Sequence, residues 1–166
     1  MTKKTRNDVT TTTELRAETT KPAAKPVKAV GRVSFVGAGP GDARLLTVRA
    51  AELLAAADVV IIESPEQAAL VTTDAEIFDG GVNAEGAILT HAARAKLVVK
   101  HAKTGANVVR LMTGDPFTYA TGPEEALACV KAEIPFEIVP GISSVGAVPA
   151  YAGVPLTTKQ NREFKV

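Results

Sequence analysis

The chain has 166 residues, of which 46% are hydrophobic, and its formal net charge at pH 7 is +1. This length suits one globular domain with an apolar core, and the small net charge disfavours binding to nucleic acid or to a membrane surface. Cys129 is the only cysteine, which excludes an intrachain disulfide and favours a reducing, cytoplasmic location. One cysteine and two histidines cannot fill a typical zinc site, so we expect no metal.

The first 30 residues differ from the rest in composition. They carry five Lys and two Arg against one Asp and two Glu, a net charge of +4, and include the run Thr10 to Thr13. They lack the apolar segment of a secretory signal, and no stretch of the chain reaches the roughly 18 apolar residues of a membrane span. We therefore expect residues 1–30 to be a disordered, solvated tail and residues 31–158 to form the folded domain.

From residue 32 onward, short apolar runs alternate with segments of helical periodicity. The run DVVII at 58–62 is typical of a strand that is buried on both faces. We expect five strands, at 32–36, 58–62, 76–78, 107–112 and 135–139. We expect helices at 45–57, 65–70, 88–103, 123–132 and 142–151. This alternation predicts an α/β fold with a five-stranded, mainly parallel sheet flanked by helices.

Three glycine-rich loops, at 37–42, 113–116 and 140–146, follow predicted strands. Ligands bind at the carboxyl ends of parallel strands, so these loops are the candidate site. The first loop reads GAGPGD, and Asp42 stands where a dinucleotide-binding fingerprint requires its third glycine. A pyrophosphate would meet the Asp42 carboxylate, which disfavours NAD. We expect Asp42 to cap the following helix instead.

The second and third loops each allow two interpretations. Asp115 precedes Pro116, which favours an extended backbone and a projecting carboxylate, although an ordinary Asp-Pro turn is the alternative. Ser143 and Ser144 follow the third strand-terminal glycine. They are either helix caps or a small polar wall for an adenine or methionine group.

Taken together and in this order, the three loops resemble the tetrapyrrole methylase family, most closely its uroporphyrinogen-III C-methyltransferase branch. The matching stretches are VGAGPGDARLLTVRAAELLAAADVVI, VVRLMTGDPFTYATGPEEALACV and PFEIVPGISSVGAVPAYAGVPLT. The resemblance covers residues 31–158 and implies the first of two α/β domains, with S-adenosylmethionine (SAM) held in the cleft between them. It also implies that the second domain is absent and that residues 159–166 begin the interdomain linker.

The resemblance implies roles for individual residues. Contacts to SAM are implied for Pro40, Thr113, Gly114, Asp115, Thr118, Ser143 and Ser144. Glu63 stands where the family often has an aspartate proposed as the catalytic base, and its extra methylene moves the carboxylate by about 1 Å. Two departures are visible, because Thr113 replaces the first glycine of the family's Gly-Gly-Asp, and Ala120-Thr121-Gly122 replaces its Gly-Arg-Gly.

The implied reaction is methyl transfer from SAM to ring carbons of uroporphyrinogen III, which gives precorrin-2 for sirohaem or cobalamin. A base then removes a proton from the ring system. The substrate carries eight carboxylates, and the candidates to face them are Arg44, Arg49 and Arg110. The full-length enzyme is expected to form a homodimer.

Two other functions fit parts of the sequence. A common Rossmann-like SAM methyltransferase would use Glu63 to hold the ribose, but it would not explain the second and third loops. A degenerate domain would bind a tetrapyrrole or a partner protein without catalysis. Among the remaining residues, we expect His91 and His101 to lie on the surface of their helix, and Cys129 to lie in the core.

Overall fold

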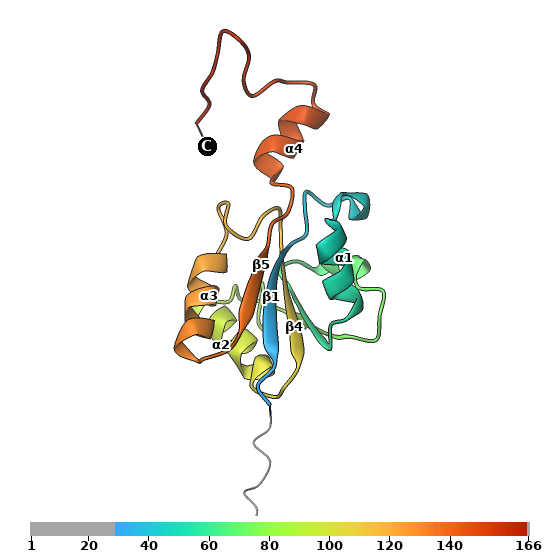
Figure 1. Cartoon of the computed structure of the whole chain (residues 1–166), viewed down its shortest axis with the longest axis vertical. Helices are drawn as coiled ribbons and strands as arrows, with labels where there is room; N and C mark the ends of the chain where they lie inside the picture. Colours follow the sequence, from blue (N-terminus) through green and yellow to red (C-terminus); the bar gives the residue numbers. More distant parts are fainter. Residues whose placement is uncertain (1–28, 166) are drawn as a thin grey trace, which may run out of the picture.

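The computed structural model describes residues 29–165, so the tail predicted for residues 1–30 lies almost wholly outside the described part. The described residues form the predicted α/β fold, with one five-stranded sheet between two layers of helices (Figure 1). The strands are β1 (Arg32–Gly37), β2 (Val59–Ile62), β3 (Glu76–Asp79), β4 (Asn107–Met112) and β5 (Phe136–Val139). The helices are η1 (Ala43–Leu45), α1 (Val48–Ala55), η2 (Pro65–Leu70), α2 (His91–Ala102), α3 (Gly122–Lys131) and α4 (Ser144–Tyr151), with η1 and η2 of the 3-10 type.

The strand order is β3-β2-β4-β1-β5, and all four pairings are parallel. The central pair is β1 and β4, which are in register from Arg32 opposite Asn107 to Gly37 opposite Met112. The chain leaves β1 towards β2 on one side of this pair, and it leaves β4 towards β5 on the other side. The carboxyl ends of β1 and β4 therefore form a topological switch point, where open α/β sheets bind their ligands.

Each face of the sheet has its own apolar core. Phe35 of β1 belongs to the core beneath α2 and α3, whereas its neighbour Val36 belongs to the core beneath α1 and η2. This alternation is the two-residue period of a strand that is covered on both sides. All four residues of β2 are buried, as the run DVVII predicted. Cys129 is fully buried in the first core, which confirms its prediction.

Three helices begin later than predicted, and in two of them, α1 and α2, a threonine caps the start. Thr47 accepts a hydrogen bond from the Ala50 amide at 3.1 Å, so α1 begins at Val48 and the predicted helical start at Leu45 is wrong. Thr90 accepts one from the Ala93 amide at 3.2 Å and starts α2 in the same way. A threonine side chain at the N-cap satisfies an amide that the helix itself leaves unpaired. Within residues 29–165, no helix has the length and hydropathy to span a bilayer.

His101 is buried, and its predicted surface position is wrong. It shares a helical face with Val98, which packs on the sheet, and its ring lies 4.1 Å from the ring of Phe78 between centroids. Its Nε2 has no hydrogen-bond partner among the described residues. Burial, and to a lesser degree the charge of Lys100, lower the pKa of His101 below its ordinary value, while Glu76 opposes the shift. His91 is exposed, as predicted.

The buried imidazole predicts a loss of stability in mild acid. Folding lowers the pKa of His101 below its unfolded-state value of 6.5, so protonation favours the unfolded state. The free energy of unfolding should therefore decrease as the pH falls from above 6.5 through the lowered pKa of the folded state. Urea unfolding measures this free energy. Between about pH 7.5 and about pH 5, it should decrease less for His101→Gln than for wild type. His91→Gln, on the exposed side of the same helix, should follow wild type. If the free energy of unfolding decreased equally in both variants, the acid sensitivity could not be assigned to buried His101.

Candidate functional site

The three glycine-rich loops meet at the carboxyl end of the sheet. The backbones of Gly39 and Gly114 are paired by two hydrogen bonds, of 3.1 and 2.9 Å. A Cβ atom placed on Gly141 would lie 2.2 Å from the Gly114 carbonyl oxygen and 2.7 Å from the Gly37 Cα. Such distances leave no room for a side chain, so the contact requires glycine. Gly39 and Gly114 also have positive φ angles, of +70° and +65°.

Asp115 ties the second loop to the third. Its Oδ2 accepts a hydrogen bond from the Gly141 amide at 3.1 Å, while its Oδ1 accepts from the Phe117 amide at 2.9 Å and from the Thr118 hydroxyl at 3.2 Å. The carboxylate thus both closes an Asp-Pro turn and reaches across to the neighbouring loop. The two interpretations that the sequence left open hold at the same time.

The serines of the third loop lie beside the second loop. The Cα of Ser143 and the amide nitrogen of Ser144 are the atoms nearest to a Cβ built on Gly114, at 3.7 and 3.6 Å. Ser143 also caps α4, because its hydroxyl oxygen accepts a hydrogen bond from the Val145 amide at 3.2 Å. The structure therefore brings Pro40, Asp115 and the two serines to one end of the sheet rather than to different faces.

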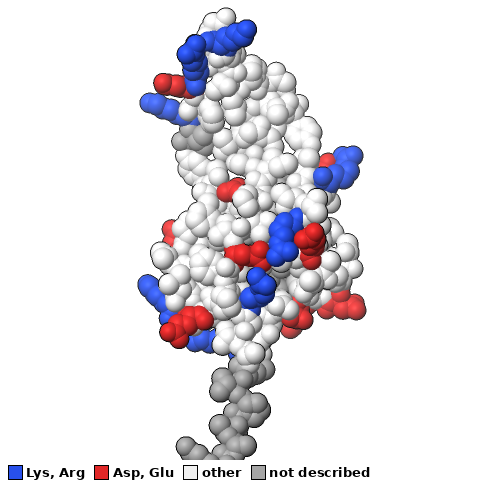
Figure 2. Space-filling model, viewed as in Figure 1, with Lys and Arg blue, Asp and Glu red and all other residues white. Residues whose placement is uncertain are grey.

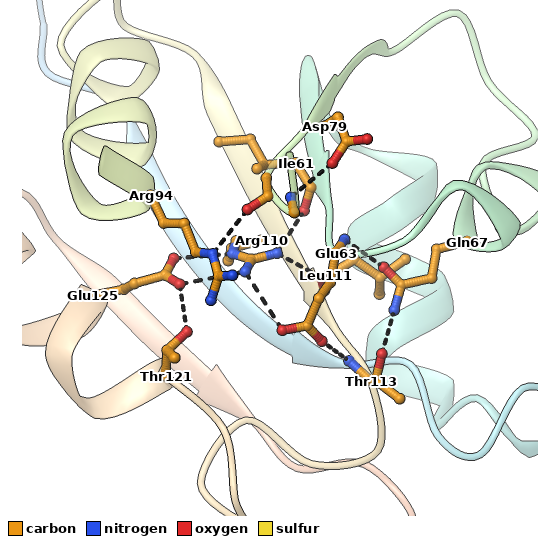
Figure 3. A network of polar contacts seen from close by, with 12 residues as sticks. Ile61, Glu63, Gln67, Asp79, Arg94, Arg110, Leu111, Thr113, Thr121 and Glu125 are labelled. Carbon is orange, nitrogen blue, oxygen red and sulfur yellow. Dashed lines mark hydrogen bonds and ion pairs between the residues drawn. The ribbon is translucent and has the colours of Figure 1, made fainter. Parts of the chain in front are cut away.

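Glu63 follows β2 directly and points towards the start of the second loop (Figure 3). Its Oε2 accepts a hydrogen bond from the Thr113 amide at 2.8 Å, and its side chain is 26% exposed. Gln67 closes a ring with these two residues, since its Oε1 accepts from the Glu63 amide at 2.7 Å and its Nε2 donates to the Thr113 hydroxyl at 3.2 Å. Sequence reasoning missed Gln67, because a single glutamine in a short helix carries no signal of burial.

Arg110 is buried, so the prediction that it faces the substrate carboxylates is wrong. Its side chain is 0% exposed and donates two hydrogen bonds to Glu125, from Nε to Oε2 at 2.9 Å and from Nη2 to Oε1 at 3.3 Å. Glu125 is also fully buried. The sequence held one signal for this pair, namely an arginine inside the apolar run of the predicted strand 107–112.

The other two predicted arginines are exposed but already paired. Arg44 contacts Asp42, with Nη2 at 2.7 Å from Oδ2, and this bond lowers the pKa of Asp42. Asp42 caps the short 3-10 helix η1 through the Arg44 amide, whereas the predicted helix that follows, α1, is capped by Thr47. Arg49 donates to Glu137 at 3.1 Å and to Glu52 at 3.3 Å. Both guanidinium groups are therefore already paired with carboxylates of the chain itself.

A cavity of about 200 Å³ opens beside the first two loops. Its lining comes from loop 37–42, from η2 and its preceding serine, and from the start of loop 113–116; the residues are Ala38, Gly39, Pro40, Gly41, Ser64, Glu66, Gln67, Leu70 and Thr113. Among the predicted site residues, Pro40 and Thr113 line it, whereas Thr118, Ser143 and Ser144 lie outside it. Within residues 29–165, no three His, Cys, Asp or Glu side chains are grouped for a metal ion.

Comparison with known sequences assigns the chain to a family. Residues 32–165 match the family described as Tetrapyrrole (Corrin/Porphyrin) Methylases. The chain belongs to this family. Its relatives lie in the uroporphyrinogen-III C-methyltransferase branch, as the resemblance of the three loops predicted. The family match covers every element of this tetrapyrrole methylase chain from β1 to α4.

Two curated tetrapyrrole methylases illustrate the similarity. Siroheme synthase 2 of Yersinia pestis is 43% identical over 139 residues, which are 82% of this chain and 29% of that protein. A protein of Methanosarcina barkeri named S-adenosyl-L-methionine-dependent uroporphyrinogen III methyltransferase is 43% identical over 134 residues, or 79% of this chain and 52% of that protein. The chain thus spans about half the length of the methyltransferase and less than a third of the synthase.

Solved tetrapyrrole methylases share the fold. The crystal structure of uroporphyrin-III-C-methyltransferase from Thermus thermophilus superposes with a TM-score of 0.67 at 36% identity, covering 79% of this chain and 56% of that one. A structure of the Thermus thermophilus enzyme complexed with S-adenosyl homocysteine gives a TM-score of 0.62 at 37% identity, covering 78% of this chain and 51% of that one.

The contact between the three loops makes Gly141 intolerant of a side chain. Because a Cβ there would meet backbone atoms of two other loops, Gly141→Ala should lower the free energy of unfolding by about 1–3 kcal/mol. Gly146 lies inside α4 with open space around a Cβ, so Gly146→Ala should leave stability unchanged or raise it by up to about 1 kcal/mol. Urea denaturation measures both. A Gly141→Ala variant as stable as wild type would rule out the close contact.

Proposed function

We propose that this chain forms the SAM-binding half of an enzyme that methylates uroporphyrinogen III to give precorrin-2, the precursor of sirohaem and cobalamin. The observation that carries the proposal is the meeting of the three loops at the topological switch point. The names of the relatives from Methanosarcina barkeri and Thermus thermophilus support the same reaction and methyl donor.

The loops have the properties that a site for SAM requires. The glycine contact keeps side chains away from the centre, so a ligand would meet backbone amides and carbonyls at close range. The cavity beside Pro40 and Thr113 gives an adjacent recess. We assign SAM binding to the residues that surround these two features: Pro40, Thr113, Gly114, Asp115, Thr118, Ser143 and Ser144.

Asp115 has a specific part in this arrangement. Both of its carboxylate oxygens already accept hydrogen bonds from the second and third loops. Asp115 would therefore act by fixing the two loops at the correct separation, so that their backbone atoms contact the ligand. Such a role depends on alignment, which is the main demand of a transfer reaction between two bound molecules.

Glu63 is the proposed base. SAM, when bound, supplies a sulfonium methyl group that an electron-rich pyrrole carbon attacks. The chain must then accept the proton that the methylated ring loses. Glu63 fits this role because it is partly exposed, lies at the carboxyl end of β2, and is held by the Thr113 amide. Its hydrogen bond to Thr113 also places it beside the loop assigned to the methyl donor.

The substrate's carboxylates require cations that the predicted arginines do not offer. Arg110 is buried, and Arg44 and Arg49 are paired with acids of the chain itself. Figure 2 shows Lys and Arg side chains over the C-terminal segment, which follows α4 beyond the carboxyl ends of the strands. Three exposed cations lie in this segment: Lys159, Arg162 and Lys165. We assign to them the contacts with substrate carboxylates beyond the carboxyl ends of the strands.

We also propose that a second α/β domain supplies the other wall of the cleft, and that residues 159–166 lead into it. The support is that the chain spans 52% and 56% of the two uroporphyrinogen methyltransferases that it matches. Formation of a homodimer and a cytoplasmic location belong to this proposal. The degenerate, non-catalytic domain remains the second candidate, because the Gly-Arg-Gly segment of the family is replaced here by Ala120-Thr121-Gly122.

The proposal is tested with an extended chain, in which these 166 residues are joined to the part of the Methanosarcina barkeri relative that lies outside the matched 52%. The extended chain should convert uroporphyrinogen III to precorrin-2 in the presence of SAM. Glu63→Gln should lower kcat by about 10²- to 10⁴-fold, because the base is lost, while SAM affinity stays within about twofold. Chromatography of the products and calorimetric titration of SAM measure the two quantities.

Each alternative has its own outcome in this experiment. Loss of SAM affinity in Glu63→Gln would favour a ribose-binding role and would overturn the assignment of Glu63 as the base. Binding of uroporphyrinogen III without any methyl transfer by the wild-type extended chain would overturn the enzymatic proposal and favour the non-catalytic domain. The conservative variant Glu63→Asp, which restores the family's usual residue, should keep measurable activity.

A further inference from the structure

The buried guanidinium of Arg110 has contacts on all sides (Figure 3). Besides its two hydrogen bonds to Glu125, its Nη1 donates to the carbonyl oxygens of Leu111 at 3.0 Å and Ile61 at 3.4 Å. The planar group is therefore fixed in one orientation between β2, β4 and α3. A lysine could not reproduce this arrangement, because it lacks the rigid fork of donors.

The same guanidinium also faces Glu63. Nη2 of Arg110 lies 3.8 Å from Oε1 of Glu63, and the other carboxylate oxygen of Glu63 accepts the hydrogen bond from the Thr113 amide. Arg110 thus stands between one fully buried carboxylate, Glu125, and one partly exposed carboxylate at the edge of the site. Glu125 is the closer partner of Arg110. This pairing is needed because an unpaired charge at a fully buried position is costly.

Thr121, the residue before α3, completes the network. Its hydroxyl donates to Oε1 of Glu125 at 2.8 Å. Thr121 is the N-cap residue of α3, yet its side chain makes no capping hydrogen bond. Its hydroxyl therefore serves Glu125 rather than the helix amides that a threonine ordinarily caps.

The segment 113–121 is consequently held at both ends by one set of side chains. At its start the Thr113 amide is bound to Glu63, and at its end the Thr121 hydroxyl is bound to Glu125. Arg110 lies between these two glutamates. A change at Thr121 or Glu125 should therefore reach Glu63 through Arg110, although neither residue touches Glu63 in the described contacts.

We propose that Thr121 and Glu125 are positioning residues, which orient the Glu63 carboxylate and its bond to Thr113 by fixing the Arg110 guanidinium. The part of this proposal that concerns catalysis rests on the proposed function of Glu63. The geometric part does not, since it concerns contacts within the folded chain. Positioning of a base affects turnover rather than ground-state binding of the methyl donor.

The first test uses the Thr113 amide as a reporter in the 166-residue chain. Thr121→Val removes the hydroxyl and keeps the shape of the side chain, so the Thr113 amide should exchange with solvent about 10-fold faster than in wild type. Thr121→Ser keeps a hydroxyl and should restore the wild-type rate. Glu124→Gln, at the exposed neighbouring position of α3, is the matched control and should have no effect. Hydrogen exchange followed by NMR measures all four proteins.

The second test measures kinetics in the extended chain. Thr121→Val should lower kcat by about 10-fold and change the KM for SAM by less than about twofold, whereas Thr121→Ser and Glu124→Gln should match wild type. Glu125→Gln should produce a larger loss of kcat. If Glu125→Gln does not fold, the Thr121 pair alone decides, because its hydroxyl can be removed without leaving a buried charge unpaired.

The outcomes separate the two proposals. Unchanged Thr113 exchange and unchanged kcat in Thr121→Val would overturn the positioning role, even if the wild-type enzyme methylates uroporphyrinogen III. Faster Thr113 exchange without any methyl transfer by the wild-type extended chain would instead support the positioning of Glu63 and overturn the proposed function. A rise in the KM for SAM equal to the fall in kcat would show a general loosening of the loop and would also overturn the positioning role.

Discussion

The site depends on the close contact of three glycines at the carboxyl ends of β1, β4 and β5. Gly37, Gly114 and Gly141 approach so closely that a Cβ atom on Gly37 or Gly141 would lie within 2.2 to 2.6 Å of backbone atoms of another loop. The parallel sheet delivers the three strand ends side by side, and the absence of side chains lets the loops close over them. The loops meet there through backbone atoms, and Asp115 ties two of them together by hydrogen bonds.

A second constraint lies beneath these loops, where Arg110 is enclosed with Glu125. A buried ion pair adds little net stability compared with apolar residues, because both charges lose their hydration. Its contribution here is geometric, since it connects the start of α3 with the carboxylate that follows β2. The glycine contact and the ion pair act on the same segment, 113–121, one from the side of the third loop and the other from inside the domain. The proposed base and the loop proposed to bind the methyl donor are therefore held in place by the same network of side chains.

The sequence predicted the architecture well, because it depends on patterns of local origin. The apolar runs predicted the five strands, and the structure brings together the three loops that were predicted to form the candidate site. What remained hidden depends on contacts between distant positions. The burial of His101 follows from the packing of α2 against Phe78, and the burial of Arg110 requires a carboxylate 15 positions later in the chain. The ring of Glu63, Gln67 and Thr113 joins two strand ends that periodicity alone cannot place side by side.

The central claim is that the three loops together contact the methyl donor, and NMR titration of the 166-residue chain with S-adenosyl homocysteine tests it most directly. The largest amide shifts should fall in the loop 37–42 and in residues 113–118 and 140–144, with an affinity weaker than about 1 µM, because the proposed second domain would supply the other wall of the cleft. Shifts confined to another surface, such as the groove between α2 and α3, or submicromolar binding by this chain alone, would contradict the account.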